Sequence, residues 1–186
     1  EEISQVLKPL FTGMDRSYVN LPAQTPYRES PGEDLTEEMD VTQAKLCMGF
    51  ITPITNKSPE FAAMQVFNAV YGAGMTSKLF VNVREKLSLC YYAGSGYYGS
   101  KGIVTVSSGI DECNYETAKA EILRQLDEMR QMHSTDAEFD AAKKSIRSAI
   151  KQVYDEPSSM EMWWLGRMLS GRDTTPEEEI ARIESV

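Results

Sequence analysis

The stretch Gly72–Tyr91 reads GAGMTSKLFVNVREKLSLCY, and the rest of the chain can be placed around it. A glycine-containing corner at 72–74 opens the stretch. The spacing of the apolar residues then predicts a helix over about 76–86, in which a hydroxyl of Thr76 or Ser77 caps the first turn. A strand begins near Leu89. The helical face available for burial consists of Leu79, Phe80 and Val83.

The glycines favour a tight corner between two helices, because a phosphate-binding loop follows a strand and carries a fuller glycine pattern. Taken alone, Arg84 is typical of a solvated helix residue and Tyr91 of a half-buried strand residue. Together they have another use. A cation and a phenol beside one helix-to-strand turn can bind a carbonyl oxygen or an anion.

The whole string resembles the second, non-metal half of the pitrilysin/insulinase family of zinc peptidases. The family pattern here is G-G-G-M-S-S-R-L-F, three residues, then R-E-K-x-G-L-x-Y. This chain keeps the register, including Arg84, Glu85, Lys86 and Tyr91. None of its departures alters the Arg84/Tyr91 pair; they are Ala73, Thr76, Lys78 and Ser88.

The resemblance implies that Arg84 and Tyr91 reach a peptide lying in the zinc site, hold its backbone and support the oxyanion. It also implies that the zinc is held by a partner half, so this chain would carry no metal ligand and no cofactor. Two functions follow. The chain is either the substrate-binding half of a two-domain zinc metallopeptidase or a non-catalytic scaffold subunit paired with an active partner. Outside the family, a stand-alone α+β interaction module is a third reading.

Residue types give little chemistry within the chain itself. The only histidine is His133, and the H-x-x-E-H metal signature is absent, so no metal triad of the usual kind can form. The fragment alone is therefore predicted to be inactive. An H-x-x-E-H motif upstream would decide for the enzyme over the scaffold.

Three widely spaced cysteines make neither a disulfide framework nor a zinc pattern. We expect Cys47, Cys90 and Cys113 to be buried thiols in a reducing compartment, which predicts a cytoplasmic protein. The formal net charge of −9 argues against a nucleic-acid partner and mildly favours basic peptides. No apolar run reaches the roughly 18 residues of a membrane span, so no membrane association is expected.

The segments before the central stretch have clear patterns. A helix is expected over Glu2–Phe11, followed by a proline-rich linker over 15–33. Residues 35–51 read as a strand whose inward face carries Ala44, Leu46, Met48 and Phe50. Ser58 and Pro59 then begin a helix that runs to Tyr71.

After the central stretch, strands over about 89–98 and 102–110 form a hairpin. A helix capped by Asn114 follows, and a capping box of Thr135 and Glu138 begins the next. Another helix starts at Ser158 or Ser159, and we expect most of its apolar residues to be core. They are Met160, Trp163, Trp164, Leu165, Met168 and Leu169. Thr175 opens a last helix, which ends near Ile183.

A hairpin followed by a block of helices indicates an α+β fold, with an antiparallel-rich sheet and helices packed on one face. The resemblance makes this one half of a pitrilysin-family clamshell. We divide the chain into 1–33, a helix and linker left from the preceding half, and 34–186, the C-terminal peptidase-family domain. Relatives continue beyond the equivalent of Val186, so we expect the last strand of this domain to be missing.

Overall fold

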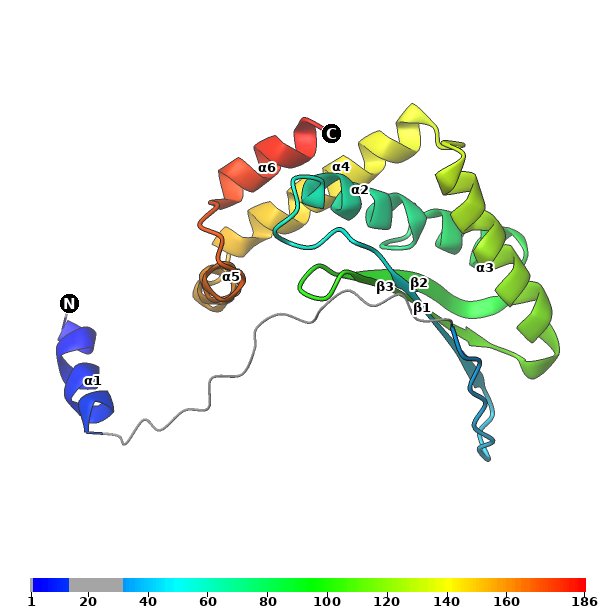
Figure 1. Ribbon diagram of the computed structural model, residues 1–186, viewed down its shortest axis with the longest axis horizontal. Helices are drawn as coiled ribbons and strands as arrows, with labels where there is room; N and C mark the ends of the chain where they lie inside the picture. Colours follow the sequence, from blue (N-terminus) through cyan, green and yellow to red (C-terminus); the bar gives the residue numbers. More distant parts are fainter. Residues whose placement is uncertain (1, 14–31) are drawn as a thin grey trace.

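The computed structural model describes residues 2–13 and 32–186, and within these ranges an antiparallel sheet lies under a layer of helices (Figure 1). The strands are β1 (Ala44–Ile51), β2 (Cys90–Tyr98) and β3 (Ile103–Ile110), in the order β1-β3-β2. The helices are α1 (Glu2–Thr12), α2 (Phe61–Tyr71), α3 (Tyr115–Arg130), α4 (Asp136–Lys151), α5 (Pro157–Ser170) and α6 (Pro176–Glu184). Shorter helical segments are η1 (Leu79–Lys86), η2 (Glu112–Asn114) and η3 (Gln152–Tyr154). The α+β prediction is confirmed.

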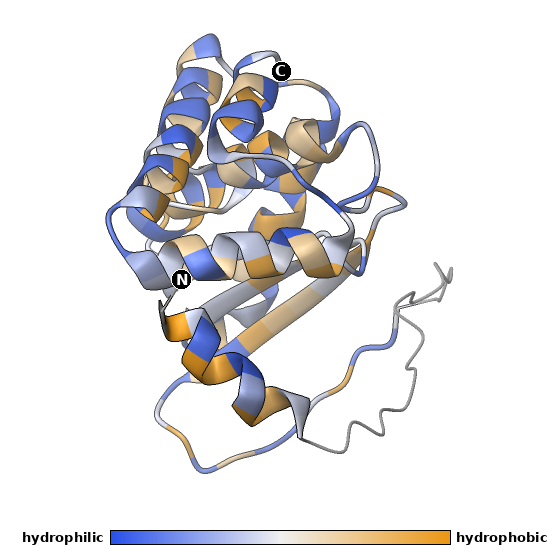
Figure 2. Ribbon diagram, turned by 90° about the vertical axis from the view of Figure 1, so that its left-hand side faces the viewer, coloured by the Kyte–Doolittle hydropathy of each residue, from blue (hydrophilic) through white to orange (hydrophobic). Residues whose placement is uncertain are grey.

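The sheet has a covered face and an open face, because successive side chains of a strand point in opposite directions. Along β1 the exposed fraction alternates, with Leu46 buried and Lys45 exposed. The predicted inward set of β1 is confirmed: Leu46 is in the core, and Ala44, Met48 and Phe50 pack against it. Phe50 is only partly buried. Figure 2 shows apolar and polar segments alternating along the helices, as expected for helices with one buried face.

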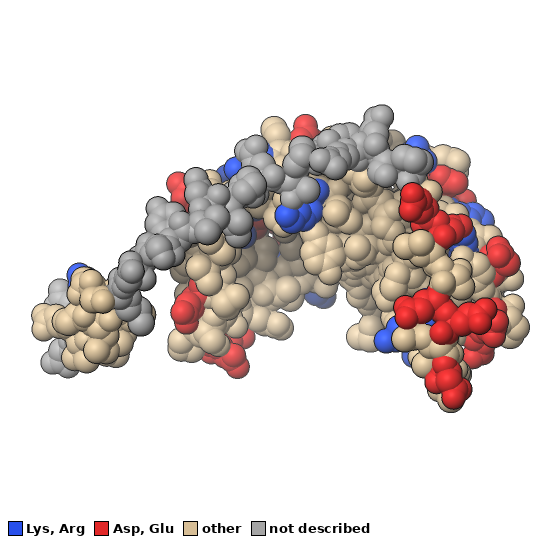
Figure 3. Space-filling model, turned by 60° about the horizontal axis from the view of Figure 1, so that its bottom comes forward, with Lys and Arg blue, Asp and Glu red and all other residues tan. Residues whose placement is uncertain are grey.

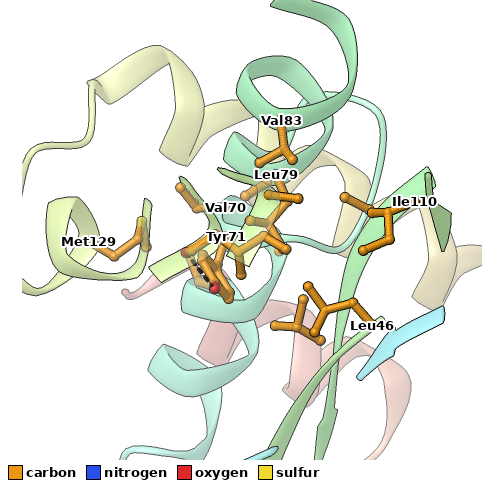
Figure 4. Packing of buried hydrophobic residues seen from close by; sticks show 14 of the residues in the cluster. Leu46, Val70, Tyr71, Leu79, Val83, Ile110 and Met129 are labelled. Carbon is orange, nitrogen blue, oxygen red and sulfur yellow. Dashed lines mark hydrogen bonds between the residues drawn. The ribbon is translucent and has the colours of Figure 1, made fainter. Parts of the chain in front are cut away.

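The core lies between the sheet and the helices and is centred on Tyr71, whose side chain is fully buried (Figure 4). Its hydroxyl donates a hydrogen bond to the backbone oxygen of Ile122 in α3, at 3.1 Å. Leu79 and Val83 of η1 are also fully buried. The core therefore joins α2, α3 and η1, the element that ends beside β2.

The glycine corner is confirmed as a structural turn between α2 and η1. The backbone oxygen of Gly72 accepts a hydrogen bond from the Ser95 N–H of β2, at 3.0 Å. A Cβ at Gly72 would lie 2.6 Å from that nitrogen, so a side chain would separate the corner from the strand. Gly74 has φ +126°, a conformation that favours glycine.

The helix expected over 76–86 is a π-helix, η1, which begins only at Leu79. Its ending shows the wider turn, since the Leu87 N–H donates to the oxygen of Asn82, five residues back. Of the two hydroxyls proposed as caps, Ser77 is the one that acts, because its Oγ accepts from the Phe80 N–H at 3.3 Å.

Two expectations about the first part of the chain need comment. The helix at the N-terminus is confirmed as α1, whose apolar residues Ile3 and Val6 are exposed. The strand expected from residue 35 begins only at Ala44. Residues 35–41 are exposed and make no ladder, because no described strand lies beside them to pair their backbone groups. The linker over 15–33 falls mainly outside the described residues, and the division at residue 33 stays a prediction.

Three further expectations are wrong. Asn114 does not cap α3 through its side chain, since its backbone is already helical, with φ −93° and ψ −2°. The thiols of Cys47 and Cys113 are exposed, and Cys47 is so because it points to the open face of β1. In α5, Trp164, Leu165, Met168 and Leu169 are exposed rather than core.

The last predicted elements are confirmed. Capping boxes begin α4 at Thr135 and α6 at Thr175, and α6 ends at Glu184. Among the helices in the described ranges, none combines the length and the hydropathy that a membrane crossing requires.

Candidate functional site

A β-bulge at the start of β2 determines where Tyr91 points. Cys90 is paired with Ile110 of β3 and Tyr92 with Gly109, so Tyr91 is an extra residue between them. Ala93 is buried under the helices, and side chains two residues apart in a regular strand point to the same face. A regular strand would therefore turn Tyr91 toward the helices. The bulge turns it outward instead, and 61% of Tyr91 is exposed.

Arg84 lies directly against this bulge. Its Nε donates a hydrogen bond to the backbone oxygen of Tyr91 at 2.8 Å, and its Nη1 contacts Glu85 Oε1 at 2.6 Å. The guanidinium carbon lies 4.8 Å from the centre of the Phe80 ring, within the range of a cation–π contact. The structure thus brings the two predicted site residues together, with Arg84 bound to the backbone that carries Tyr91.

The Arg84 side chain is 39% exposed and keeps donors for a ligand. A guanidinium has five N–H donors. The contacts of Arg84 within the described ranges use Nε and Nη1, and no hydrogen bond of Nη2 occurs there. Burial raises the pKa of the neighbouring Cys90 thiol, although Ser108 and the Arg84 charge oppose this.

The Tyr91 hydroxyl is held only loosely. Its one described contact is with the Asp111 carboxylate at 3.5 Å, at the limit of a hydrogen bond. Tyr92 differs, since its hydroxyl lies 3.3 Å from Ser107 Oγ and its ring lies over Gly109. A Cβ at Gly109 would approach that ring to 2.5 Å. Tyr92 is therefore packed across the open face, whereas Tyr91 is free to turn toward a ligand.

η1, which carries Arg84, is fixed at its start by a partly buried ion pair. Lys78 donates to Glu138 Oε1 at 3.0 Å and to the backbone oxygen of His133 at 2.9 Å. Farther along η1, the Asn82 amide donates to Gln125 of α3 at 2.8 Å. These contacts fix η1 against the α3–α4 junction and so define the position from which Arg84 leaves the helix.

Beneath the helices, the open face of the sheet is hollowed and mostly uncharged, with Asp and Glu gathered at one end (Figure 3). The segment 33–40 is rich in acidic residues and exposed throughout. One of them, Asp34, contacts Lys119 of α3 at 3.0 Å.

Within the described part of the chain, no three His, Cys, Asp or Glu residues cluster as metal ligands would. His133 is exposed, and its Nδ1 lies 3.0 Å from Glu128. The site therefore consists of donors that can bind a carbonyl oxygen or an anion, with no metal ligand set beside them.

The chain matches a known protein family over most of its length. The family model described as "Peptidase M16 inactive domain" matches residues 1–146. A relative from Bacillus subtilis named "Probable inactive metalloprotease YmfF" is 34% identical over 154 residues, which cover 83% of this chain and 36% of that protein. An "Uncharacterized zinc protease" of Rickettsia bellii is 27% identical over 151 residues, covering 79% of this chain and 36% of its own.

Solved structures share the fold. A conserved protein from Enterococcus faecalis superposes with a TM-score of 0.81 at 30% identity, covering 98% of this chain and 44% of its own. A peptidase M16 inactive domain from Pseudomonas fluorescens gives a TM-score of 0.59 at 20% identity, covering 77% and 38%. The chain thus spans about a third of the length of the curated relatives. The family description implies no catalytic zinc site in this chain.

Sequence reasoning missed the parts of the site that depend on tertiary pairing. No local signal marks the bulge, because a bulge is defined by the pairing of two strands, here an extra residue of β2 relative to β3. Asp111 also escaped notice, since it reaches Tyr91 only after β3 has returned beside β2. The spacing of four between Phe80 and Arg84 was readable and could have suggested their contact.

Proposed function

The chain belongs to the family of peptidase M16 inactive domains, and from this premise we propose that it is the substrate-binding half of a two-domain zinc metallopeptidase. The observation that carries the proposal is the Arg84–Tyr91 bulge. A cation and an outward-turned phenol lie together beside the hollowed open face, while no three His, Cys, Asp or Glu residues of the described ranges cluster as metal ligands would.

In the proposed mechanism, Arg84 and Tyr91 act on the carbonyl of a peptide bound to a zinc-carrying half. Negative charge grows on that oxygen as water attacks, so donors aimed at it stabilise the transition state more than the ground state. Arg84 supplies a fixed, permanently charged fork, and it also binds peptide backbone. The Tyr91 hydroxyl supplies one further donor and is free to do so, since among the described residues its one contact is with Asp111 at 3.5 Å.

The acidic segment 33–40 adds an expectation about substrates. It is exposed and lies in a protein of net charge −9. Carboxylates near a binding surface attract cationic ligands and speed their association at low salt. Peptides with Lys or Arg are therefore the preferred class in this proposal.

A second function is favoured by one finding. The Bacillus subtilis relative at 34% identity is named "Probable inactive metalloprotease YmfF". On this alternative, the parent protein is a silent subunit that binds or scaffolds beside an active partner. The same Arg84–Tyr91 bulge would then serve peptide binding without turnover.

The zinc content and the peptidase activity of the parent protein that contains this chain distinguish the two functions. We expect it to hold zinc in its other half and to cleave a quenched basic peptide, and Arg84→Lys to lower kcat on the order of a hundredfold because the ammonium loses the fork geometry. Lys86→Arg, a charge-conserving change in the same η1, is the matched control and should leave kcat unchanged. A parent protein that holds no zinc and cleaves nothing would reject the enzyme and favour the silent subunit.

A further inference from the structure

A pocket lies at the opposite end of β2 from Tyr91, bounded by α2, α4, α5 and the β2–β3 turn. Its volume is about 510 Å³, within the range of small-molecule sites. Figure 1 shows α5 beside the end of the hairpin. Tyr97 lines this pocket and lies six positions beyond Tyr91 along the strand, or roughly 20 Å away. The pocket is therefore separate from the proposed peptide site.

Two partly buried arginines form one wall of the pocket. Arg167 and Arg172 both lie against the fully buried carboxylate of Glu179, at 3.7 Å and 2.5 Å. Each guanidinium also covers an aromatic ring, Arg167 over Trp163 at 3.7 Å and Arg172 over Phe61 at 4.5 Å. Two partly buried cations thus share one fully buried anion, which leaves an excess positive charge at the pocket wall.

Hydrogen-bonding capacity beside these cations is unused. Arg167 Nε is buried and has no hydrogen-bond partner among the residues that the structure describes, and the same holds for Gln65 Oε1. Both residues line the pocket. A buried polar atom without a partner costs free energy, so such atoms mark places where a ligand or water completes the bonding. Arg167 Nε is thus an unused donor and Gln65 Oε1 an unused acceptor.

From this arrangement we infer that the pocket binds a small organic oxyanion, carboxylate or phosphate, through Arg167 and Arg172. The oxyanion would accept from the guanidinium groups and balance their excess charge. The body of the ligand would lie against the apolar wall formed by Phe61, Ala69 and Ile146, with a donor directed to Gln65. None of these residues belongs to the Arg84–Tyr91 bulge, so the inference is independent of peptidase activity.

Titration calorimetry at constant ionic strength tests the inference with inorganic phosphate, acetate and benzoate as probes. We expect saturable binding of phosphate or acetate, and the one that binds more tightly identifies the source of the oxyanion. Benzoate should bind at least about threefold more tightly than acetate, because its ring is buried on the apolar wall. Absence of saturable binding by all three probes would overturn the inference.

A matched pair of α4 variants locates the site. Ser145 lines the pocket and is exposed, so Ser145→Glu introduces a competing carboxylate and should weaken binding by about tenfold or more. Ser148 is exposed on the same helix and does not line the pocket, so Ser148→Glu should change binding by less than about twofold. Equal loss in both variants would show a general charge effect and would also overturn the inference.

Discussion

Replacing Tyr71 by Phe tests the packing that places η1. The Tyr71 ring is fully buried, and its hydroxyl donates to the Ile122 oxygen at 3.1 Å (Figure 4). Tyr71→Phe keeps the ring, so it opens no large cavity. The oxygen of Ile122 lies inside α3, where it also accepts the helix's own hydrogen bond. The loss is therefore about 1 kcal/mol at pH 8, the usual net contribution of one hydrogen bond.

The same substitution has a pH dependence of known sign. Burial raises the pKa of Tyr71 above its ordinary value of 10.0. The raised pKa means that ionisation is easier in the unfolded chain. The contribution to stability is then full below pH 10 and is lost as pH rises toward the folded pKa. At pH 11 this loss reaches about 1.4 kcal/mol, one pKa unit of free energy.

Phe does not ionise, so the variant escapes this loss. We expect wild type to be more stable by about 1 kcal/mol at pH 8, and the variant to equal or exceed wild type near pH 11. Urea unfolding at both pH values, with Tyr91→Phe as the exposed control, measures the two differences. A gap between wild type and Tyr71→Phe that stays constant from pH 8 to pH 11 would refute the reasoning.

Three further expectations concern the fold and the metal. In urea unfolding, Leu46→Ala should lower the free energy of unfolding by about 3 kcal/mol and half-buried Phe50→Ala by about 2 kcal/mol. A larger loss for Phe50→Ala than for Leu46→Ala would show that the β1 register is assigned wrongly. Burial raises the pKa of Glu138, but hydrogen bonds from Thr135 and Lys78 outweigh it and hold this pKa below its usual value. Glu138→Gln should then destabilise the fold by about 1 kcal/mol at pH 7, and this difference should fade below pH 4. A difference that persists below pH 4 would contradict the assignment. After zinc reloading and dialysis, elemental analysis of this chain should find well under one zinc per chain, and one tightly held zinc would refute that prediction.

Much of the architecture was readable from local pattern. The alternation in β1 fixed the inward set because a sheet with one covered face permits only one register. Thr135 and Thr175 began helices as expected, since a capping box is a local device. The close packing of Gly72 on Ser95 agrees with the interpretation of the glycines as a corner.

The failures share a physical cause, which is that burial depends on what covers a surface. The apolar residues of α5 have helical spacing, but spacing does not say which face meets a neighbour, and Met168 and Leu169 are exposed. Cys47 was expected to be buried because of its residue type, whereas its place in the β1 alternation turns it to the open face. Tyr91 is the converse case, since its outward direction depends on the bulge opposite Ile110.

The most direct test of the central claim is the kcat of Tyr91→Phe beside that of Tyr92→Phe, measured in the two-domain zinc metallopeptidase of which we propose this chain to be one half. Each substitution removes one hydroxyl from adjacent residues of β2, but the Tyr92 hydroxyl already contacts Ser107 at 3.3 Å. We expect Tyr91→Phe to lower kcat by about a hundredfold to a thousandfold with zinc content unchanged, as for loss of one oxyanion donor, and Tyr92→Phe to stay near wild type. Wild-type kcat in Tyr91→Phe, or an equal loss in both variants, would contradict the assignment of Tyr91 to the substrate carbonyl.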